Sequence, residues 1–424
     1  MREYTSEYDF AKAKDAEDKL AGFADRFYKL EGRIYMDGNS LGLLSRDAEE
    51  TLLQALDSWK TDAIDIWGKH GYFLYHNKLG AMIAPLLNAD PEEVTVGGST
   101  TVNIHQAIAT FYKPEGDRCK ILVDDLNFPT DRYAIESQIA LHSLDPKKCL
   151  KTVESSDGRF IDEDAIINAM TDDVCLVLLP SALYRSAQLV DMKKISNAAH
   201  ERGITVGFDL CHSIGTVPHD FKAIDPDFAV WCNYKYLSAG PGAVAGMYIN
   251  KRHFDLIPGL TGWWGYNNDT QFDLALNFDH QRDAGGWQIG TSSILSMAPL
   301  EGSLKIIEEA GIENIREKSL DLTGYLMYLI DEKLTKYGFS VGNSRDDEKR
   351  TGHVALVHDD AIRINEAMKA RGIVPDFRFP DIIRLAPVAL YTSFSEIYDM
   401  VSIIADIMEK KEYEQFDNKR GTIA

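Results

Sequence analysis

Two segments of the sequence carry side chains that could do chemistry. Lys235 stands among tyrosines and apolar residues, between a strand-like run and a glycine-rich turn at 240–242. Burial lowers the pKa of a lysine and makes its amine a nucleophile. Asp209 directly follows another apolar run, where a carboxylate either caps a turn or meets a ligand. His212, three residues further on, is either a partner in such a site or a histidine satisfied near the core.

A third segment, residues 97–101, could bind an anion. Two glycines and three hydroxyl residues precede a run whose apolar spacing at Ile104, Ile108 and Phe111 predicts a helix. Backbone N–H groups and the positive end of the helix converge at such a start. The simpler alternative is that the hydroxyls only cap the helix. The segment is not a P-loop, because no Gly-Lys-Ser/Thr follows the glycines.

Together, the three segments match the needs of pyridoxal phosphate. This cofactor requires a lysine for its Schiff base, a carboxylate opposite its pyridinium nitrogen and a cradle for its phosphate. Lys235, Asp209 and the residues 99–101 could supply these three parts. A nicotinamide-dependent dehydrogenase is disfavoured, because no G-x-G-x-x-G follows the first strand-like run.

The elements that must position these residues form an alternating pattern. Short apolar runs predict strands at 93–96, 120–123, 174–179, 205–208, 228–231 and 246–249. Continuous apolar strands separated by helix-length segments are typical of a mostly parallel sheet that is covered on both faces. Ligands bind at the carboxyl ends of the strands in such a sheet. Asp209 and Lys235 each follow one of these runs, so we expect both at that edge.

The pattern changes beyond residue 300. A long helical stretch at 300–334 is followed by strand-like runs near 339–341, 353–356 and 382–385 and by helices near 360–369 and 393–411. This mixture suits a small α+β domain. We therefore predict an N-terminal segment that partly joins the small domain (1–60), a large domain (61–300) and a small C-terminal α+β domain (301–424).

Composition limits the partners of the chain. Its 424 residues are 45% hydrophobic and 26% charged, as is ordinary for a globular protein with a large core. The net charge of −21 disfavours nucleic acid and anionic membrane surfaces as partners. No apolar run approaches the length of a bilayer span, and the N-terminus lacks a signal-peptide pattern. Five widely spaced cysteines predict free thiols, no metal site and a cytoplasmic location.

The sequence resembles the kynureninase family, whose members are pyridoxal-phosphate enzymes of fold type I. The most specific similarities are Trp-Cys-Asn-Tyr-Lys-Tyr-Leu at 231–237 and Arg-Leu-Ala-Pro-Val at 384–388. Further segments that carry the resemblance are 37–42, 100–105, 127–138, 208–209, 262–265 and 390–391. The resemblance implies an aspartate aminotransferase-like α/β fold with a seven-stranded, mostly parallel sheet in the large domain. It also implies hydrolytic cleavage of the Cβ–Cγ bond of L-kynurenine, or of its 3-hydroxy derivative, to anthranilate or 3-hydroxyanthranilate and L-alanine.

The resemblance implies a role for each matching residue. Lys235 would form the Schiff base, Asp209 would face the pyridine nitrogen, and Tyr234 would protonate Cβ. The implied cofactor-binding residues are Thr100, Thr101, Phe128, Asp131, Asp209, His212, Tyr234, Lys235, Trp263 and Thr291. Within this set, Phe128 would stack on the cofactor ring.

The resemblance further implies a homodimer with shared active sites. Trp263 and Thr291 match residues that reach the phosphate of the neighbouring subunit. Arg384 matches the arginine that holds the α-carboxylate of the substrate, a task that suits a bidentate guanidinium. Two departures from the family pattern stand out. Serines occupy 292–293, where the family usually has Pro-Pro, and Pro180 stands where some relatives have a phosphate-binding hydroxyl, which Ser181 would have to replace.

Two alternatives to kynurenine cleavage stay open. One is another reaction on the same scaffold, such as cysteine desulfuration or transamination. Desulfuration requires a mobile thiol near the substrate, whereas Cys211 and Cys232 stand in or beside strands and are expected to be buried. The other is a non-catalytic regulator that binds the cofactor, although a regulator would not need Lys235, Asp209 and Arg384 together.

Overall fold

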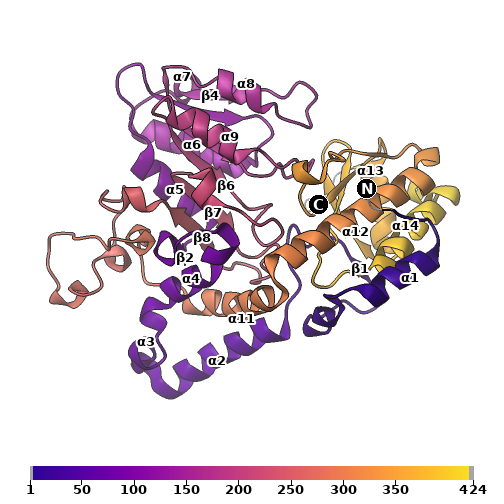
Figure 1. Cartoon of the computed structure of the whole chain (residues 1–424), viewed down its shortest axis with the longest axis horizontal. Helices are drawn as coiled ribbons and strands as arrows, with labels where there is room; N and C mark the ends of the chain where they lie inside the picture. Colours follow the sequence, from indigo (N-terminus) through magenta and orange to yellow (C-terminus); the bar gives the residue numbers. More distant parts are fainter. Residues whose placement is uncertain (1–2, 420–424) are drawn as a thin grey trace.

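The computed structural model describes residues 3–419, and Figure 1 shows a larger and a smaller body. The larger body is built on a seven-stranded sheet in the order β2-β8-β7-β6-β5-β3-β4, in which β8 is antiparallel to both neighbours and the other pairs are parallel. Its strands are β2 (Val94–Gly97), β3 (Lys120–Asp124), β4 (Leu150–Val153), β5 (Val174–Pro180), β6 (Thr205–Asp209), β7 (Phe228–Cys232) and β8 (Ala245–Ile249). The prediction of a mostly parallel seven-stranded sheet is confirmed.

The apolar runs locate every strand of this sheet except β4. That strand lies at the edge of the sheet, where it pairs only with β3. Three of its four residues are half-buried, so its sequence Leu-Lys-Thr-Val lacks the continuous apolar run of the central strands.

Helices cover both faces of the sheet because its strands are apolar on both sides. Along β5, Leu176 and Leu178 point into one hydrophobic core and Val177 and Leu179 into another, with the two-residue period of a strand. The helices α5 (Thr100–Phe111) and α6 (Pro129–Leu141) cover the first core, and α4 (Tyr75–Leu87), α9 (Met192–His200) and α11 (Ile294–Ala310) cover the second. Alongside α11 lies α2 (Arg46–Asp62).

The smaller body contains a four-stranded antiparallel sheet in the order β12-β13-β10-β9. Its strands are β9 (Ser340–Val341), β10 (Val354–Val357), β12 (Asp376–Arg378) and β13 (Ile382–Leu385). Around it pack α1 (Tyr8–Glu17), α12 (Ile312–Lys333), α13 (Ala361–Ala370) and α14 (Phe394–Glu409). From the N-terminal segment, β1 (Ile34–Tyr35) pairs with β11 (Ile373–Val374).

The long helical stretch predicted at 300–334 consists of two helices. Gly311 separates α11 from α12 with a φ of +76°, a conformation that glycine adopts more easily than other residues. In Figure 1, α11 lies along the larger body and α12 continues from it into the smaller body.

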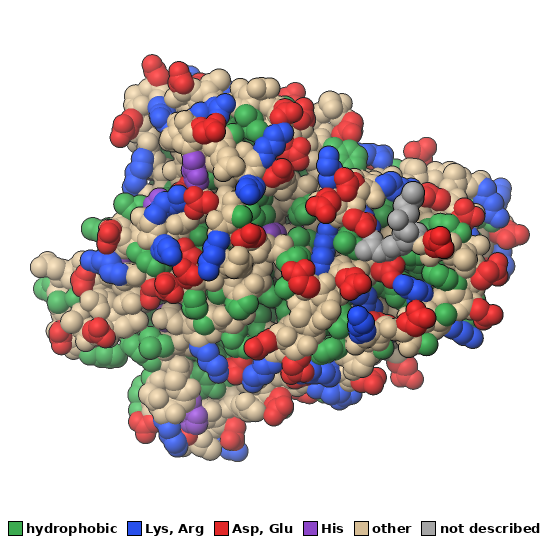
Figure 2. All heavy atoms as spheres, in the orientation of Figure 1, with side chains coloured by type: hydrophobic (Ala, Val, Ile, Leu, Met, Phe, Trp, Pro, Cys, Tyr) green, Lys and Arg blue, Asp and Glu red, His purple; other side chains and the backbone are tan. Residues whose placement is uncertain are grey.

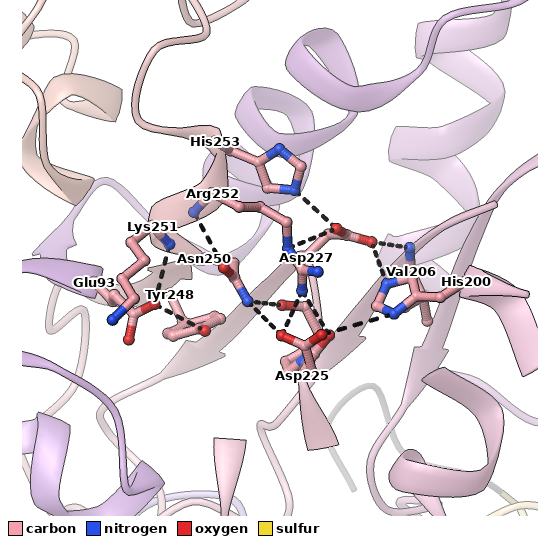
Figure 3. A network of polar contacts seen from close by, with 11 residues as sticks. Glu93, His200, Val206, Asp225, Asp227, Tyr248, Asn250, Lys251, Arg252 and His253 are labelled. Atoms are coloured by element: carbon pink, nitrogen blue, oxygen red, sulfur yellow. Dashed lines mark hydrogen bonds and ion pairs between the residues drawn. The ribbon is translucent and has the colours of Figure 1, made fainter. Parts of the chain in front are cut away.

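A polar network holds the edge of the large sheet where β6 and β7 begin (Figure 3). The buried Asp227 accepts hydrogen bonds from Nε2 of His253 at 2.8 Å, from Nε2 of His200 at 3.1 Å and from the backbone N–H of Val206 at 2.8 Å. Burial acts to raise the pKa of Asp227, but the hydrogen bonds from His253, Val206 and His200 lower it below its ordinary value. This edge therefore carries a fully bonded, charged carboxylate.

On the face shown in Figure 2, acidic and basic side chains are interspersed over both bodies. Among residues 3–419, no helix is long and apolar enough to cross a membrane. All five cysteines are free, as predicted, and Cys211 and Cys232 are buried.

Candidate active site

At the opposite edge of the large sheet, the loops after β6 and β7 bring Lys235 and His212 into contact. Nζ of Lys235 lies 2.9 Å from Nε2 of His212. Burial and the neighbouring charge of Lys235 lower the pKa of His212 well below its ordinary value, so the imidazole is neutral at pH 7. A neutral imidazole whose Nε2 accepts from an ammonium carries its hydrogen on Nδ1. Nδ1 of His212 is buried and has no hydrogen-bond partner.

The surroundings of Lys235 correct one sequence-based expectation. Burial acts to lower the pKa of Lys235, but the acidic groups of Cys232, Cys211 and Asp209 raise it above its ordinary value. The prediction that burial leaves a low-pKa amine is therefore wrong for this arrangement. It considered the apolar residues beside the lysine in the sequence and not the acids that the fold brings around it.

Two buried carboxyl groups, Asp209 and Asp131, lie near this lysine and near each other. Oδ1 of Asp209 accepts from the N–H of Cys211 at 2.7 Å, and Oδ2 of Asp131 accepts from Nδ2 of Asn127 at 2.8 Å. Burial raises the pKa of Asp209, and burial together with the charge of Asp209 raises that of Asp131 well above the ordinary value. Oδ1 of Asp131 has no hydrogen-bond partner. The protein's own groups therefore only partly offset the charge of the two carboxyls and only partly satisfy their hydrogen bonding.

The segment at 97–101 serves as a helix start beside these carboxyls. Ser99 is the N-cap of α5 and accepts from the N–H of Val102 at 3.4 Å. The hydroxyl of Thr100 lies 4.0 Å from Sγ of Cys211, and that of Thr101 lies 2.8 Å from the hydroxyl of Thr130. The capping interpretation is therefore correct, and it does not exclude the anion site, since the first N–H groups of a helix lack partners within it.

Phe128 and Tyr234 complete the part of the site nearest the lysine. Phe128 is the N-cap of α6 and is 44% exposed, and its ring meets the edge of Tyr184 at a centroid distance of 5.5 Å. Tyr234 is half-buried directly before Lys235, and its carbonyl accepts from the N–H of Gly42 at 2.8 Å. Burial raises the pKa of Tyr234, so its phenol is protonated.

Arg384, on β13, enters from the smaller body and is almost completely buried. Its Nε donates to Asp376 at 2.6 Å and its Nη2 to the hydroxyl of Ser40 at 2.9 Å. Its Nη1 donates to the carbonyl of Tyr184 at 2.9 Å. Asp376, Ser40 and Tyr184 were not predicted from the sequence. Asp376 and Tyr184 stand in no chemical motif, and Ser40 lies in the segment 37–42 that carries the resemblance but was given no role there.

Trp263 and Thr291 are the two predicted residues that no contact within residues 3–419 brings to Lys235. Trp263 is 41% exposed, and Thr291 is exposed as well. Thr291 lines a cavity of about 320 Å³ together with Gly97, Gly98 and Val102, on the outer side of the predicted anion site. Both residues therefore face outwards.

Ser181, the candidate replacement for a phosphate-binding hydroxyl, has its side chain bonded to groups of the protein itself. It is fully buried, and its hydroxyl donates to the carbonyl of Asp209 at 3.0 Å and bonds the hydroxyl of Ser213 at 2.7 Å. Its N–H donates to the same Asp209 carbonyl at 2.8 Å. Ser181 thus fixes the backbone that carries the Asp209 carboxylate.

Known proteins of one family are similar in sequence to this chain. A sequence model of the kynureninase C-terminal domain matches residues 315–404. Kynureninases from Bacillus thuringiensis subsp. konkukian and Geobacillus thermodenitrificans are 56% and 53% identical to this chain, in each case over 98% of both proteins. The kynureninase of Shouchella clausii is 49% identical over 99% of this chain and 98% of its own length.

Solved structures show the same fold at low sequence identity. A cystine C–S lyase variant with glycine linked to its pyridoxal phosphate has a TM-score of 0.78 and 18% identity, over 90% of this chain and 98% of the other. A cysteine desulfurase from Thermococcus onnurineus has a TM-score of 0.72 and 16% identity, over 94% and 98% of the two chains. These similarities support the fold and not the reaction.

Proposed function

This chain belongs to the kynureninase family, and from that premise we propose how its residues share the work of the reaction. The protein is a pyridoxal-phosphate enzyme of the aspartate aminotransferase-like fold, and it hydrolyses the Cβ–Cγ bond of L-kynurenine to anthranilate and L-alanine. When bound, pyridoxal phosphate supplies an electron sink for the negative charge that develops on the amino acid. The observation that carries the assignment of roles is the meeting of Lys235, Asp209 and the start of α5 at one sheet edge.

The residues present at this edge fit that cofactor. Asp131 and His212 each bury a polar atom that has no partner, which is uncommon in folded proteins unless a ligand completes the bond. The unpaired N–H groups at the start of α5, with Thr100 and Thr101, would hold the phosphate. Lys235 would bind the aldehyde carbon, and Phe128 would cover the ring.

The residues around Lys235 would handle the protons of the reaction. Asp209 would hold a proton on the pyridine nitrogen, because a cation opposite this buried carboxylate would offset the cost of its charge. Once the substrate amine displaces it, Lys235 would take the α-proton, with the neutral His212 as its hydrogen-bond partner. Tyr234, whose raised pKa keeps its phenol protonated, would deliver a proton to Cβ.

Arg384 would orient the amino acid. Its guanidinium would bind the α-carboxylate and so fix the bonds at Cα and Cβ relative to the cofactor ring. In this division the large domain, residues 61–300, would bind the cofactor. Residues 301–424 would supply Arg384, and the N-terminal segment 1–60 would support it through Ser40.

We also propose that the enzyme is a cytoplasmic homodimer with shared sites. Trp263 contacts the exposed ring of Phe272, and Leu274 and Leu276 shortly after it in the chain are exposed as well. Exposed apolar side chains of this kind are typical of an interface. Trp263 and Thr291 would contact the phosphate bound by the partner. The five free thiols support a reducing compartment, and the net charge of −21 argues against nucleic acid or an anionic membrane as a partner.

Anthranilate fluorescence tests the reaction directly. The purified protein, loaded with pyridoxal phosphate, should convert L-kynurenine to anthranilate and L-alanine in equal amounts. Parallel assays with 3-hydroxy-L-kynurenine and L-cysteine measure the range of substrates. Release of sulfide from cysteine together with no anthranilate from kynurenine would overturn the assignment in favour of desulfuration, and inactivity on all three would favour a regulator.

A further inference from the structure

A fully buried histidine lies beside the proposed substrate site without a hydrogen-bond partner. His353 directly precedes β10 and is 0% exposed. Neither Nδ1 nor Nε2 makes a hydrogen bond of ordinary geometry. The backbone of Arg185 lies near enough to raise the pKa of the ring, but by less than burial lowers it. Buried polar atoms are nearly always paired, so an unpaired imidazole at this depth indicates a role toward a ligand.

The register of the small sheet places His353 next to Arg384. Ala355 is paired with Arg384 across the antiparallel strands β10 and β13. Directly paired residues share a face of the sheet, and residues two apart on one strand share a face as well. His353 therefore lies on the face of Arg384, as its diagonal neighbour. On the opposite face, Val354 and Leu385 pack into the core of the smaller body.

On its other side, His353 faces the reactive edge of the large sheet. Its ring meets that of His212 edge-on at a centroid distance of 6.1 Å, and His212 is bonded to Lys235. Burial first, and then the charges of Arg384 and Lys235, lower the pKa of His353 to about 3. The imidazole is therefore neutral, with one N–H to donate, and it lies near enough to both Arg384 and Lys235 to feel their charges.

Arg384 has too few free N–H groups to satisfy a substrate carboxylate by itself. A guanidinium has five N–H groups. Arg384 uses two of them on Asp376, one on Tyr184 and one on Ser40, which leaves one. A carboxylate accepts several hydrogen bonds, so one N–H does not satisfy it in a buried site.

We propose that His353 is a substrate-binding residue that donates a hydrogen bond to the α-carboxylate of the amino-acid substrate, beside Arg384. This inference rests on the proposed function, in which Arg384 binds that carboxylate. The segment before β10 is already held in place. Nδ2 of Asn343 donates to the carbonyl of His353 at 2.8 Å, and the N–H of Thr351 donates to the carbonyl of Ala187 at 3.0 Å. Such a fixed backbone lets the side chain act without a loop rearrangement.

The test compares three variants of the holoenzyme, which are His353→Phe, His353→Gln and the control His358→Gln. His358 lies in the same body and has hydrogen bonds on both ring nitrogens. Losing a hydrogen bond to a charged group should raise the KM for L-kynurenine about 10- to 100-fold in H353F. The kcat of H353F should change by less than about threefold, because the bond is present in ground state and transition state alike. H353Q keeps an N–H donor and should stay within about fivefold of the parent KM, as should H358Q.

A substrate analogue without the carboxylate shows which group His353 contacts. Binding of the decarboxylated amine of kynurenine, followed through the absorbance of the bound cofactor, should be equal in H353F and the parent. An unchanged KM for kynurenine in H353F, or an equal loss of affinity for the analogue, would overturn the proposal. If the parent enzyme makes no anthranilate, the proposed function has failed instead.

If H353F does not fold, a crystal structure of the unsubstituted holoenzyme with the product L-alanine tests whether His353 contacts the carboxylate. A ring nitrogen of His353 within about 3.2 Å of a carboxylate oxygen supports the proposal. A carboxylate bound by Arg384 and beyond reach of His353 overturns it.

Discussion

The two edges of the large sheet each carry a buried carboxylate beside histidine, and they differ in how completely the protein satisfies it. Where the strands begin, two histidines and a backbone N–H bond both oxygens of Asp227 (Figure 3), and these bonds lower its pKa in spite of burial. Where the strands end, the pKa values of Asp209 and Asp131 are raised, and Asp131 keeps an oxygen without a partner. The first edge is complete, and the second requires a partner from outside the chain.

By this difference the network around Asp227 is structural, and the pair Asp209 and Asp131 is the candidate ligand site. Both contain aspartate and histidine, so residue types alone do not distinguish them. A carboxylate whose bonds are all made by the protein contributes to stability, whereas one left with unmatched charge and free acceptors is prepared for a ligand. Substitutions at the two edges should therefore affect different measurements.

The largest effect is expected from Lys235→Ala. In the proposed mechanism Lys235 binds the cofactor covalently and takes the α-proton, so kcat should fall about 10⁴-fold or more without its amine. The visible absorbance of the covalently held cofactor should disappear as well. Substitution of an exposed lysine, Lys251→Ala, at the opposite edge is the control. Retention of turnover in K235A would show that another amine holds the cofactor.

A nearly isosteric change, Asp209→Asn, should be the next most severe for activity. The amide cannot hold a proton on the pyridine nitrogen, and we expect kcat to fall by about 10³-fold because the cofactor then withdraws electrons poorly. Since burial already disfavours this carboxylate, the variant should unfold in urea at the same concentration as the parent or a higher one. A clear loss of stability with full activity would reverse the roles of the two edges.

The chemistry at the reactive edge could be predicted because it follows apolar strands. Asp209 ends β6 and Lys235 comes three residues after the end of β7, and the rule that ligands bind where parallel strands end places both at this edge. The supports of Arg384 could not be found in this way. Asp376 lies on the three-residue strand β12, and Ser40 and Tyr184 lie in loops, so no run or period marks them.

The network around Asp227 was also missed, for a related reason. His200 ends α9, and the parallel pairing of β6 with β7 brings it to Asp227, the residue before β7. His253 lies in a short turn after β8, and the antiparallel pairing of β8 with β7 brings it to the same residue. In the sequence each of these residues is a single polar side chain between apolar elements. Their cooperation depends on contacts between distant segments, which residue spacing does not encode.

Asp227→Asn should affect stability and leave turnover nearly unchanged. An amide nitrogen would face one of the two histidine donors, and breaking a buried, bonded carboxylate costs about 2–4 kcal/mol of unfolding free energy. At a temperature where the variant is folded, its kcat for kynurenine should be within about threefold of the parent. Asp225→Asn, at a more exposed carboxylate of the same network, is the matched control and should cost less than about 1 kcal/mol. A selective loss of activity in D227N would contradict the division of roles.

The smallest expected effect is a pH dependence with opposite signs at the two edges. The folded-state pKa of Asp227 is depressed, so its stabilisation is present above the unfolded value of about 3.9 and is lost as the pH falls through the folded value. The folded-state pKa values of Asp209 and Asp131 are raised, so their contribution is present at low pH and is lost as the pH rises through those values. Urea unfolding of the parent and of D227N between pH 3 and pH 8 isolates the contribution of Asp227 to stability. The contributions of Asp209 and Asp131 are common to both proteins and cancel in the difference. The stability difference should be constant near neutral pH and shrink as the pH falls below the unfolded value of about 3.9, because the folded-state pKa of Asp227 is the lower of the two. A difference that grows as the pH falls would mean that Asp227 is protonated in the folded protein, and the two edges would then not differ in charge.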